Sequence, residues 1–219
     1  MATSSAIVLY TPDSAPLARF RETSRKITVH AGDQSATVIL EQNWGEHGVA
    51  GVLWDSAVVL TNFVLNPTSD VELHGKKIVE LGSGLGLPSI SLSLLSRPSQ
   101  IIATEQPSAI PLLQRNVHLN GAKTEVVELE WTNLDSSSIS NHNFDIILGA
   151  DLVYKEEAFE PLRDTLRRFA GKNTVIYFAS KIRYPKDRRF YRSLSGEFSV
   201  EKVMYDRETD VFVYRMRKA

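Results

Sequence analysis

The chain has 219 residues, of which 42% are hydrophobic, so it is long enough to form one α/β domain with its own core. Its formal net charge of −1 gives no electrostatic footprint for nucleic acid, and the absence of cysteine excludes disulfides and thiolate metal sites. The first residues lack the basic and then apolar pattern of a signal peptide, and no apolar run reaches the length that spans a bilayer. We therefore expect a cytoplasmic protein that contacts neither nucleic acid nor membrane.

The sequence predicts one domain preceded by an N-terminal arm. Residues 1–24 are of mixed composition and are expected to form the arm, and residues 25–219 to form the domain. Within the domain, residues 25–75 should form a β-hairpin and a helix, because alternating apolar residues flank a glycine turn and are followed by helical apolar spacing. Residues 76–219 are expected to form the core.

Apolar runs typical of buried strands alternate with helical patterns from residue 76 onward. The predicted strands are 77–81, 100–104, 125–130, 144–150, 174–179, 198–205 and 211–217. The predicted helices are 87–96, 107–120, 156–170 and 187–195. This alternation predicts a parallel sheet with helices on both faces, while the last two strands must be antiparallel because only a short turn joins them.

A glycine turn between the first core strand and its helix is the strongest candidate for a ligand site. Gly82, Gly84 and Gly86 occupy alternate positions, and glycines let backbone N–H groups approach a ligand closely at the positive end of a helix. Their spacing differs from the G-x-G-x-x-G of dinucleotide folds. Glu105 ends the next strand, roughly 20 residues further on, where a carboxylate can accept hydrogen bonds from a ribose diol. Together they predict an adenosine-type cofactor; the alternative for Glu105 is a solvated loop carboxylate.

The candidate site residues lie at the ends of several strands. Gly82, Glu105, Trp131 and Asp151 all fall at or just after strand ends, where ligands bind in open α/β sheets, so they should converge on one crevice. The five histidines show no pair at metal-ligand spacing, and we expect no metal site. No serine stands in a nucleophile-elbow sequence, which argues against hydrolase chemistry.

This pattern resembles the seven-β-strand, Rossmann-like class I methyltransferase fold, which binds S-adenosyl-L-methionine. Within that fold, four motifs resemble the methyltransferase-like protein-lysine methyltransferases: Gly51-Val52-Leu53-Trp54-Asp55, Val79-Glu80-Leu81-Gly82-Ser83-Gly84, Glu130-Trp131 and Gly149-Ala150-Asp151-Leu152-Val153-Tyr154. Three later motifs are most similar to the branch that methylates seventy-kilodalton heat-shock chaperones: Lys181-Ile182-Arg183-Tyr184, Val203-Met204-Tyr205-Asp206 and Asp210-Val211. The similarity covers about residues 25–217.

The resemblance implies a set of cofactor contacts, in which the acid at the end of the second strand is usually aspartate and is glutamate here. The implied contacts are Trp54, Gly82, Ser83, Gly84, Glu105, Trp131 and Ala150. The two tryptophans are expected to pack against adenine or to lie near the sulfonium of the cofactor. Without the resemblance, both would be interpreted as core aromatics.

Asp151 and Tyr154 are the candidate catalytic residues, because they leave the fourth strand toward the predicted crevice. We expect the Asp151 carboxylate to receive and orient the ammonium of a lysine, or to accept its proton, while Tyr154 walls the lysine channel. The alternatives are that Asp151 caps the helix 156–170 and that Tyr154 is a half-buried packing aromatic.

The sequence therefore predicts an S-adenosyl-L-methionine-dependent protein-lysine N-methyltransferase that is monomeric and acts on a seventy-kilodalton heat-shock chaperone. Two alternatives keep the fold: a small-amine N-methyltransferase and a non-catalytic chaperone-binding protein. The basic segment 181–192 is interpreted either as a docking surface for an acidic protein substrate or as a solvated helix start.

Overall fold

The computed structural model describes residues 21–219. Residues 1–20 of the predicted N-terminal arm lie outside the described residues, and the first strand already begins at Ser24.

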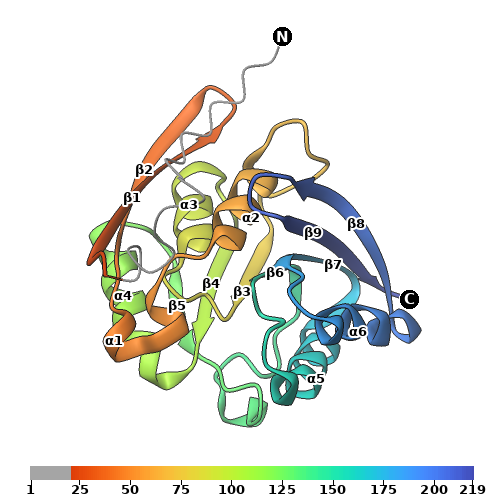
Figure 1. The fold of residues 1–219 in the computed structure, drawn as a ribbon. Coiled ribbons are helices and arrows are strands. Elements are labelled where there is room, and N and C mark those ends of the chain that lie inside the picture. The colour runs from red at the N-terminus through yellow and green to blue at the C-terminus, as the bar shows by residue number, and fades with distance from the viewer. Residues whose placement is uncertain (1–20) are drawn as a thin grey trace.

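A seven-stranded sheet forms the centre of the molecule (Figure 1). Its strands are β3 (Lys77–Leu81), β4 (Gln100–Glu105), β5 (Glu125–Glu128), β6 (Phe144–Ala150), β7 (Ala170–Lys181), β8 (Phe198–Asp206) and β9 (Val211–Lys218). Their order is β5-β4-β3-β6-β7-β9-β8; the pairs from β5 to β7 are parallel, and β9 is antiparallel to both β7 and β8. This confirms the predicted Rossmann-like sheet with antiparallel last strands. The structure differs in detail, because β7 is longer than predicted and β5 ends two residues earlier.

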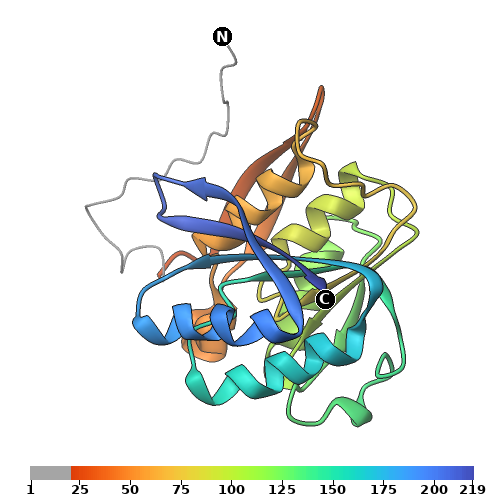
Figure 2. The same cartoon turned by 90° about the vertical axis from the view of Figure 1, so that its right-hand side faces the viewer.

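Helices cover both faces of the sheet, as Figure 2 shows. On one face lie α2 (Asp55–Leu65), α3 (Leu87–Leu95) and α4 (Ile110–Leu119), and on the other α5 (Phe159–Phe169) and α6 (Pro185–Ser193). Side chains of a strand alternate between the faces, so Ile78 of β3 packs into the first layer while Val79 and Leu81 pack into the second, all without solvent exposure. Because both faces of β3 are covered, consecutive residues from Ile78 to Leu81 are all buried, and one of them, Glu80, is an acid.

The predicted N-terminal hairpin is present and packs over the α3 and α4 side of the sheet. It consists of β1 (Ser24–Ala31) and β2 (Gln34–Glu41), which pair antiparallel. Asn116 in α4 and Asn120 just after it bond to the backbone along the outer edge of β2. Asn120 exchanges two hydrogen bonds with the Ile39 backbone at 2.7 and 2.8 Å, and Asn116 accepts from the Glu41 amide at 2.7 Å. Asn116 also donates to the Leu85 carbonyl at 3.2 Å, which connects the hairpin to the glycine turn. The edge strand is thereby covered by side chains rather than by another strand.

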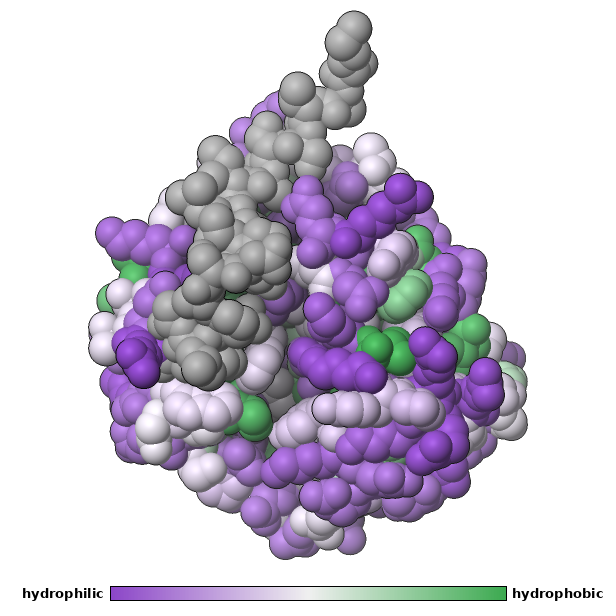
Figure 3. Space-filling model, in the orientation of Figure 1, coloured by the Kyte–Doolittle hydropathy of each residue, from purple (hydrophilic) through white to green (hydrophobic). Residues whose placement is uncertain are grey.

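The short helix α1 (Trp44–His47) and a 3₁₀ turn at Gly48–Gly51 lead from the hairpin to α2. Within residues 21–219, no single helix has the length and apolar composition to cross a membrane; a bent pair, 44–51 with 55–65, passes only when its two parts are taken together. On the face drawn in Figure 3, described side chains are mostly hydrophilic and the hydrophobic ones form small, separate patches.

Candidate active site

A cavity of about 590 Å³ opens at the carboxyl ends of β3, β4 and β6. Its volume lies within the usual range of small-molecule sites. Most of the predicted site residues line it: Trp54, Gly82, Gly84, Glu105, Trp131, Ala150, Asp151 and Tyr154. Ser83 is the exception, because its hydroxyl points inward and donates to the Glu80 carbonyl at 3.2 Å.

The glycine turn brings its backbone close to two walls of the cavity. Gly82 and Gly84 have φ angles of +54° and +53°, which side-chain-bearing residues rarely adopt. A Cβ atom at Gly82 would lie 2.7 Å from Cδ2 of Leu152 and 3.4 Å from Cζ2 of Trp131, and one at Gly84 would lie 3.4 Å from the Ala50 carbonyl oxygen. The indole of Trp131 therefore lies against the turn, and the contact that a Cβ at Gly82 would disturb is the one with Leu152.

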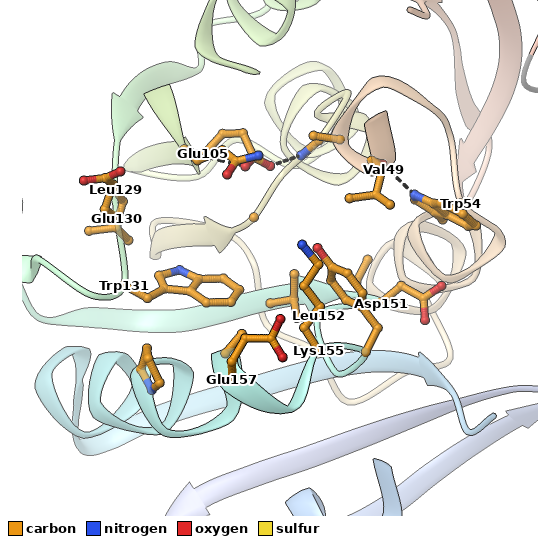
Figure 4. Close-up of a pocket in the computed structure, with 18 of the residues that line it drawn as sticks. Val49, Trp54, Glu105, Leu129, Glu130, Trp131, Asp151, Leu152, Lys155 and Glu157 are labelled. Atoms are coloured by element: carbon orange, nitrogen blue, oxygen red, sulfur yellow. Dashed lines mark hydrogen bonds between the residues drawn. The ribbon is translucent and has the colours of Figure 1, made fainter. Parts of the chain in front are cut away.

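Glu105 is a buried carboxyl group that is held by backbone amides. Its Oε2 accepts a hydrogen bond from the Gly84 amide and its Oε1 one from the Gln106 amide, both at 2.8 Å. Burial raises the pKa of Glu105, and these two hydrogen bonds oppose that shift. Among the described residues no cation pairs with it, so its environment suits neutral hydroxyl donors. In Figure 4, Glu105 and Trp131 lie toward one side of the cavity and Trp54 and Asp151 toward the other.

A second buried acid, Glu80, lies directly behind the glycine turn and was not singled out from the sequence. Its carboxyl group accepts hydrogen bonds from the amide of Ser89 at 3.0 Å and from the Ser89 hydroxyl, and the Thr104 hydroxyl donates to its carbonyl at 2.8 Å. Burial raises the pKa of Glu80 to about 8, and the charge of nearby Glu105 adds to the shift. Glu80 therefore joins β3, β4 and the start of α3 as a neutral acid at pH 7.

Trp54 closes another wall of the cavity through the loop before α2. Its Nε1 donates to the Val49 carbonyl at 2.8 Å, and Val49 and Ala50 line the cavity. Gly51 keeps this loop tight, because its carbonyl accepts from the Asn43 amide at 2.9 Å and a Cβ at Gly51 would lie 2.2 Å from the Asn43 carbonyl oxygen. Trp54 is thus a wall of the site rather than a core aromatic.

Asp151 lies at the other end of the cavity and is paired with an arginine. Its oxygens accept two hydrogen bonds from Arg183, at 3.0 Å from Nη1 and 2.9 Å from Nη2, and its side chain is 9% exposed. Its φ angle is +56°, and its amide donates to the Ala179 carbonyl of β7 at 2.8 Å. The alternative interpretation, that Asp151 caps the following helix, is wrong: α5 begins at Phe159 without a side-chain cap.

Carboxylates from both ends of the cavity act on the pKa of Tyr154. Burial raises the pKa of its phenol, and the carboxylates of Glu105, Glu157 and Asp151 raise it further. Its ring is 37% exposed at the cavity, and Tyr184, which is 60% exposed, also lines the cavity. We call Gly82, Gly84, Glu105 and Trp131 the glycine-loop end, and Asp151, Tyr154, Arg183 and Tyr184 the Asp151 end.

Several lining residues were not predicted as site residues from the sequence. They are Val49, Ala50, Gln106, Leu129, Glu130, Thr132, Leu152, Lys155, Glu157, Ala158, Pro161, Arg183 and Tyr184. One signal was available for Arg183 and Tyr184, because they follow the carboxyl end of β7 as Asp151 follows that of β6. The basic character of that segment directed the interpretation to docking instead. No comparable signal marks Val49.

The basic helix α6 starts beside the cavity and leads away from it. Lys186 donates to the Tyr154 carbonyl at 2.8 Å, and Arg189 pairs with Glu156 at 3.5 Å. Arg188 and Arg189 are exposed and do not line the cavity. Across residues 21–219, no three or more histidine, aspartate or glutamate side chains gather in a way that would hold a metal ion.

Comparisons with known proteins identify the family of the chain. The family model described as lysine methyltransferase matches residues 33–197. The chain is 37% identical over 220 residues to protein N-lysine methyltransferase METTL21A of Danio rerio, over 97% of this chain and 96% of that protein. It is 35% identical over 184 residues to EEF1A lysine methyltransferase 3 of Mus musculus, over 81% and 77% of the two chains.

A solved structure shares the fold. It is the 16S rRNA N2 G1207 methyltransferase RsmC of T. thermophilus in complex with AdoMet and guanosine, with a TM-score of 0.57 at 16% identity. The match covers 90% of this chain and 51% of the other.

Proposed function

Because the chain belongs to the lysine methyltransferase family, we propose that it uses S-adenosyl-L-methionine to methylate a lysine of a protein, and that this protein is a seventy-kilodalton heat-shock chaperone. One observation carries the proposal: a single cavity holds a buried carboxyl group, bound by backbone amides beside a glycine turn, at one end and a second carboxylate paired with Arg183 at the other. The choice of a chaperone as substrate depends on the sequence motifs near the C-terminus. Family membership alone does not decide it, because a relative of 35% identity is named for a different substrate, EEF1A.

The residues at the glycine-loop end fit S-adenosyl-L-methionine. A nucleoside needs close backbone approach, a flat apolar wall and acceptors for a ribose diol, and these are supplied by Gly82 and Gly84, by Trp131, and by the Glu105 carboxylate. Trp54 and Ala150 would contact the rest of the molecule. When bound, this cofactor supplies a methyl carbon on a positive sulfonium, whose bonding electrons leave with the sulfur as an amine attacks.

The Asp151 end can position the lysine. A lysine with a pKa of about 10.4 must lose its proton to become a nucleophile, which costs about 4–5 kcal/mol at pH 7. Tyr154 and Tyr184 would wall its aliphatic stem, and a partly dry channel lowers the cost by disfavouring the ammonium. Oδ1 of Asp151 accepts from Arg183 and also from the Lys181 backbone amide at 3.5 Å, whereas among the described residues Oδ2 accepts from Arg183 alone. Oδ2 therefore retains a lone pair that can accept an N–H of the lysine. The proton leaves to solvent water.

Incubation of the protein with labelled S-adenosyl-L-methionine and a cell lysate tests this proposal. We expect one labelled band of the seventy-kilodalton class, and intact mass and fragment analysis of the purified chaperone should then place the methyl groups on lysine. A labelled band of another size would contradict the chaperone but support protein methylation. Labelled small molecules would support the small-amine alternative, and no label would support a non-catalytic chaperone-binding protein.

A further inference from the structure

The pairing of Asp151 with Arg183 bears on the protonation state of the substrate lysine. A carboxylate beside an amine stabilises the ammonium form and so raises the pKa of the amine, whereas a nearby cation lowers it. Methyl transfer needs the neutral amine. A free Asp151 carboxylate would therefore bind the lysine in the form that cannot react, and the structure holds a cation where it offsets that charge.

The Asp151–Arg183 pair differs from the other ion pairs among the described residues. The Asp151 side chain is 9% exposed, whereas every other paired carboxylate is at least 34% exposed. Water and salt screen exposed pairs strongly and partly buried pairs much less. The two parallel hydrogen bonds also fix the guanidinium in the plane of the carboxylate. Arg183 is therefore placed to change the charge that a lysine meets at this end of the cavity.

The start of α6 holds Arg183 in position. Oδ2 of Asp187 accepts hydrogen bonds from the backbone amides of Arg183 and Tyr184, both at 2.9 Å, and Asp187 is almost fully buried. The hydrogen bonds to Asp151 raise the pKa of Arg183 further above its ordinary value, so the guanidinium stays charged at every pH at which the enzyme works. The cation is thus presented by a fixed backbone and keeps its charge.

We propose that Arg183 is a positioning residue that neutralises Asp151, so that the carboxylate still accepts a hydrogen bond from the substrate lysine without stabilising it as an ammonium. This inference rests on the proposed function. Asp151 stays a carboxylate and Arg183 a guanidinium throughout, and the proton of the lysine goes to water. The same role could not be filled by an aliphatic side chain, which would leave the charge of Asp151 uncompensated.

Other titratable groups surround the pair and would remain when Arg183 is replaced. They are Asp55 at the start of α2, Tyr154, Lys155 and Glu157 after β6, and Asp187 and Tyr191 in α6. Because these groups are common to the wild type and to every Arg183 variant, the difference between two pH profiles reports on Arg183 alone.

The test is the pH profile of kcat for methylation of a purified seventy-kilodalton chaperone, at saturating chaperone and S-adenosyl-L-methionine. In Arg183→Gln we expect the acid limb to move upward by about 1–2 pH units, with kcat approaching the wild-type value at the alkaline end. Arg183→Lys keeps a cation and should hold the limb within about half a unit of the wild type. The control is Arg115→Gln, which removes an exposed arginine that pairs with Glu41 through Nε at 3.2 Å outside the cavity.

Four results would overturn the inference. If kcat falls by the same factor at every pH, the role of Arg183 is merely structural. If KM falls or kcat rises while the acid limb stays where it is in the wild type, Arg183 only occupies the place of the lysine. A limb in Arg183→Lys that moves as far as in Arg183→Gln would mean that its charge does not matter. Wild-type protein that transfers no methyl group would contradict the proposed function and the inference with it, whereas an active wild type with parallel profiles contradicts the inference alone.

Thermal unfolding and binding of S-adenosylhomocysteine establish that each variant is folded. Should Arg183→Gln not fold, Arg183→Met keeps the aliphatic stem and gives the same readout.

Discussion

Glu105 and Asp151 are both acidic residues at strand ends in one cavity, but they have different partners. Glu105 accepts from two backbone amides and has no cation among the described residues, and burial raises its pKa. Asp151 is bound by the guanidinium of Arg183, 32 residues further along the chain. The glycine-loop end therefore suits a neutral, hydrogen-bonding ligand, and the Asp151 end suits a ligand whose positive charge must be controlled.

The two ends of the cavity also differ in how the chain builds them. The glycine turn forms from a short local sequence, and the Gly84 amide reaches Glu105 because β3 and β4 are paired. The Asp151 end needs β6, β7 and α6 to bring three separate segments together. Changes at the first end should therefore affect cofactor binding, and changes at the second should affect the rate of transfer.

The largest expected effect concerns Glu80, the buried acid behind the glycine turn. The native state holds the Glu80 proton up to about pH 8, while an unfolded chain releases it near 4.5. The contribution of Glu80 to the free energy of unfolding is therefore full below pH 4.5 and falls as pH rises to 8, by roughly 4–5 kcal/mol. Glu80→Gln should lose this dependence. Urea unfolding at pH 5 and pH 8 measures it, and equal pH dependence in the two proteins would contradict the burial of a neutral acid.

Asp151→Asn should separate the two ends most clearly in activity. We expect kcat to fall by at least about 100-fold, because the amide loses the ion pair with Arg183 and leaves an uncompensated guanidinium where the lysine must be positioned. Affinity for S-adenosylhomocysteine should stay within about twofold, because Asp151 lies at the other end from Glu105. Rate and affinity would be measured on the same preparation. An affinity that falls as far as the rate would mean that the ends are not separate.

Gly82→Ala should weaken the binding of S-adenosylhomocysteine, in contrast to Asp151→Asn, which should lower kcat. Its Cβ would collide with Leu152, which also lines the cavity, so we expect affinity for S-adenosylhomocysteine to fall at least about tenfold. Gly75→Ala is the matched control, because Gly75 also has a positive φ, +72°, but a Cβ there has no atom within 4 Å. Both variants carry a backbone cost of about 1–2 kcal/mol, and only Gly82→Ala should lose binding. Equal affinity in the two variants would show that the space at Gly82 is not used by the cofactor.

The smallest expected effect concerns the surface beyond the Asp151 end. If α6 guides an acidic protein substrate, reversing the charge of Arg188 and Arg189 together should slow methylation about two- to fivefold at low salt and less at high salt. Arg115→Glu, on α4 and outside the cavity, is the control for a charge reversal elsewhere on the surface. A rate that is insensitive to salt in all three proteins would leave α6 as a solvated helix.

Most of the fold could be predicted from the sequence because its signals are local. Apolar runs, helical spacing and the glycine turn each specify one element, and the rule that parallel strands end on one edge brought Gly82, Glu105, Trp131 and Asp151 to one cavity. The arrangement of Ser83 was not predictable in this way, since a turn sequence does not show which side chains face inward.

The rest of the site depends on tertiary contacts that no local pattern records. Arg183 pairs with Asp151 only because β7 lies beside β6, and Val49 reaches the cavity only because Trp54 holds its loop. The raised pKa of Glu80 likewise follows from complete burial behind the turn. A strand-end residue is visible in a sequence, whereas its partner from another strand is not.

A crystal structure with S-adenosylhomocysteine tests the central claim most directly, that one cavity binds the methyl donor at the glycine-loop end and the lysine at the Asp151 end. We predict ribose hydroxyls within hydrogen-bonding distance of Glu105, the base beside Trp131, and the sulfur directed toward Asp151. A ligand bound with its ribose away from Glu105, or a cavity that stays empty at saturating ligand, would contradict it.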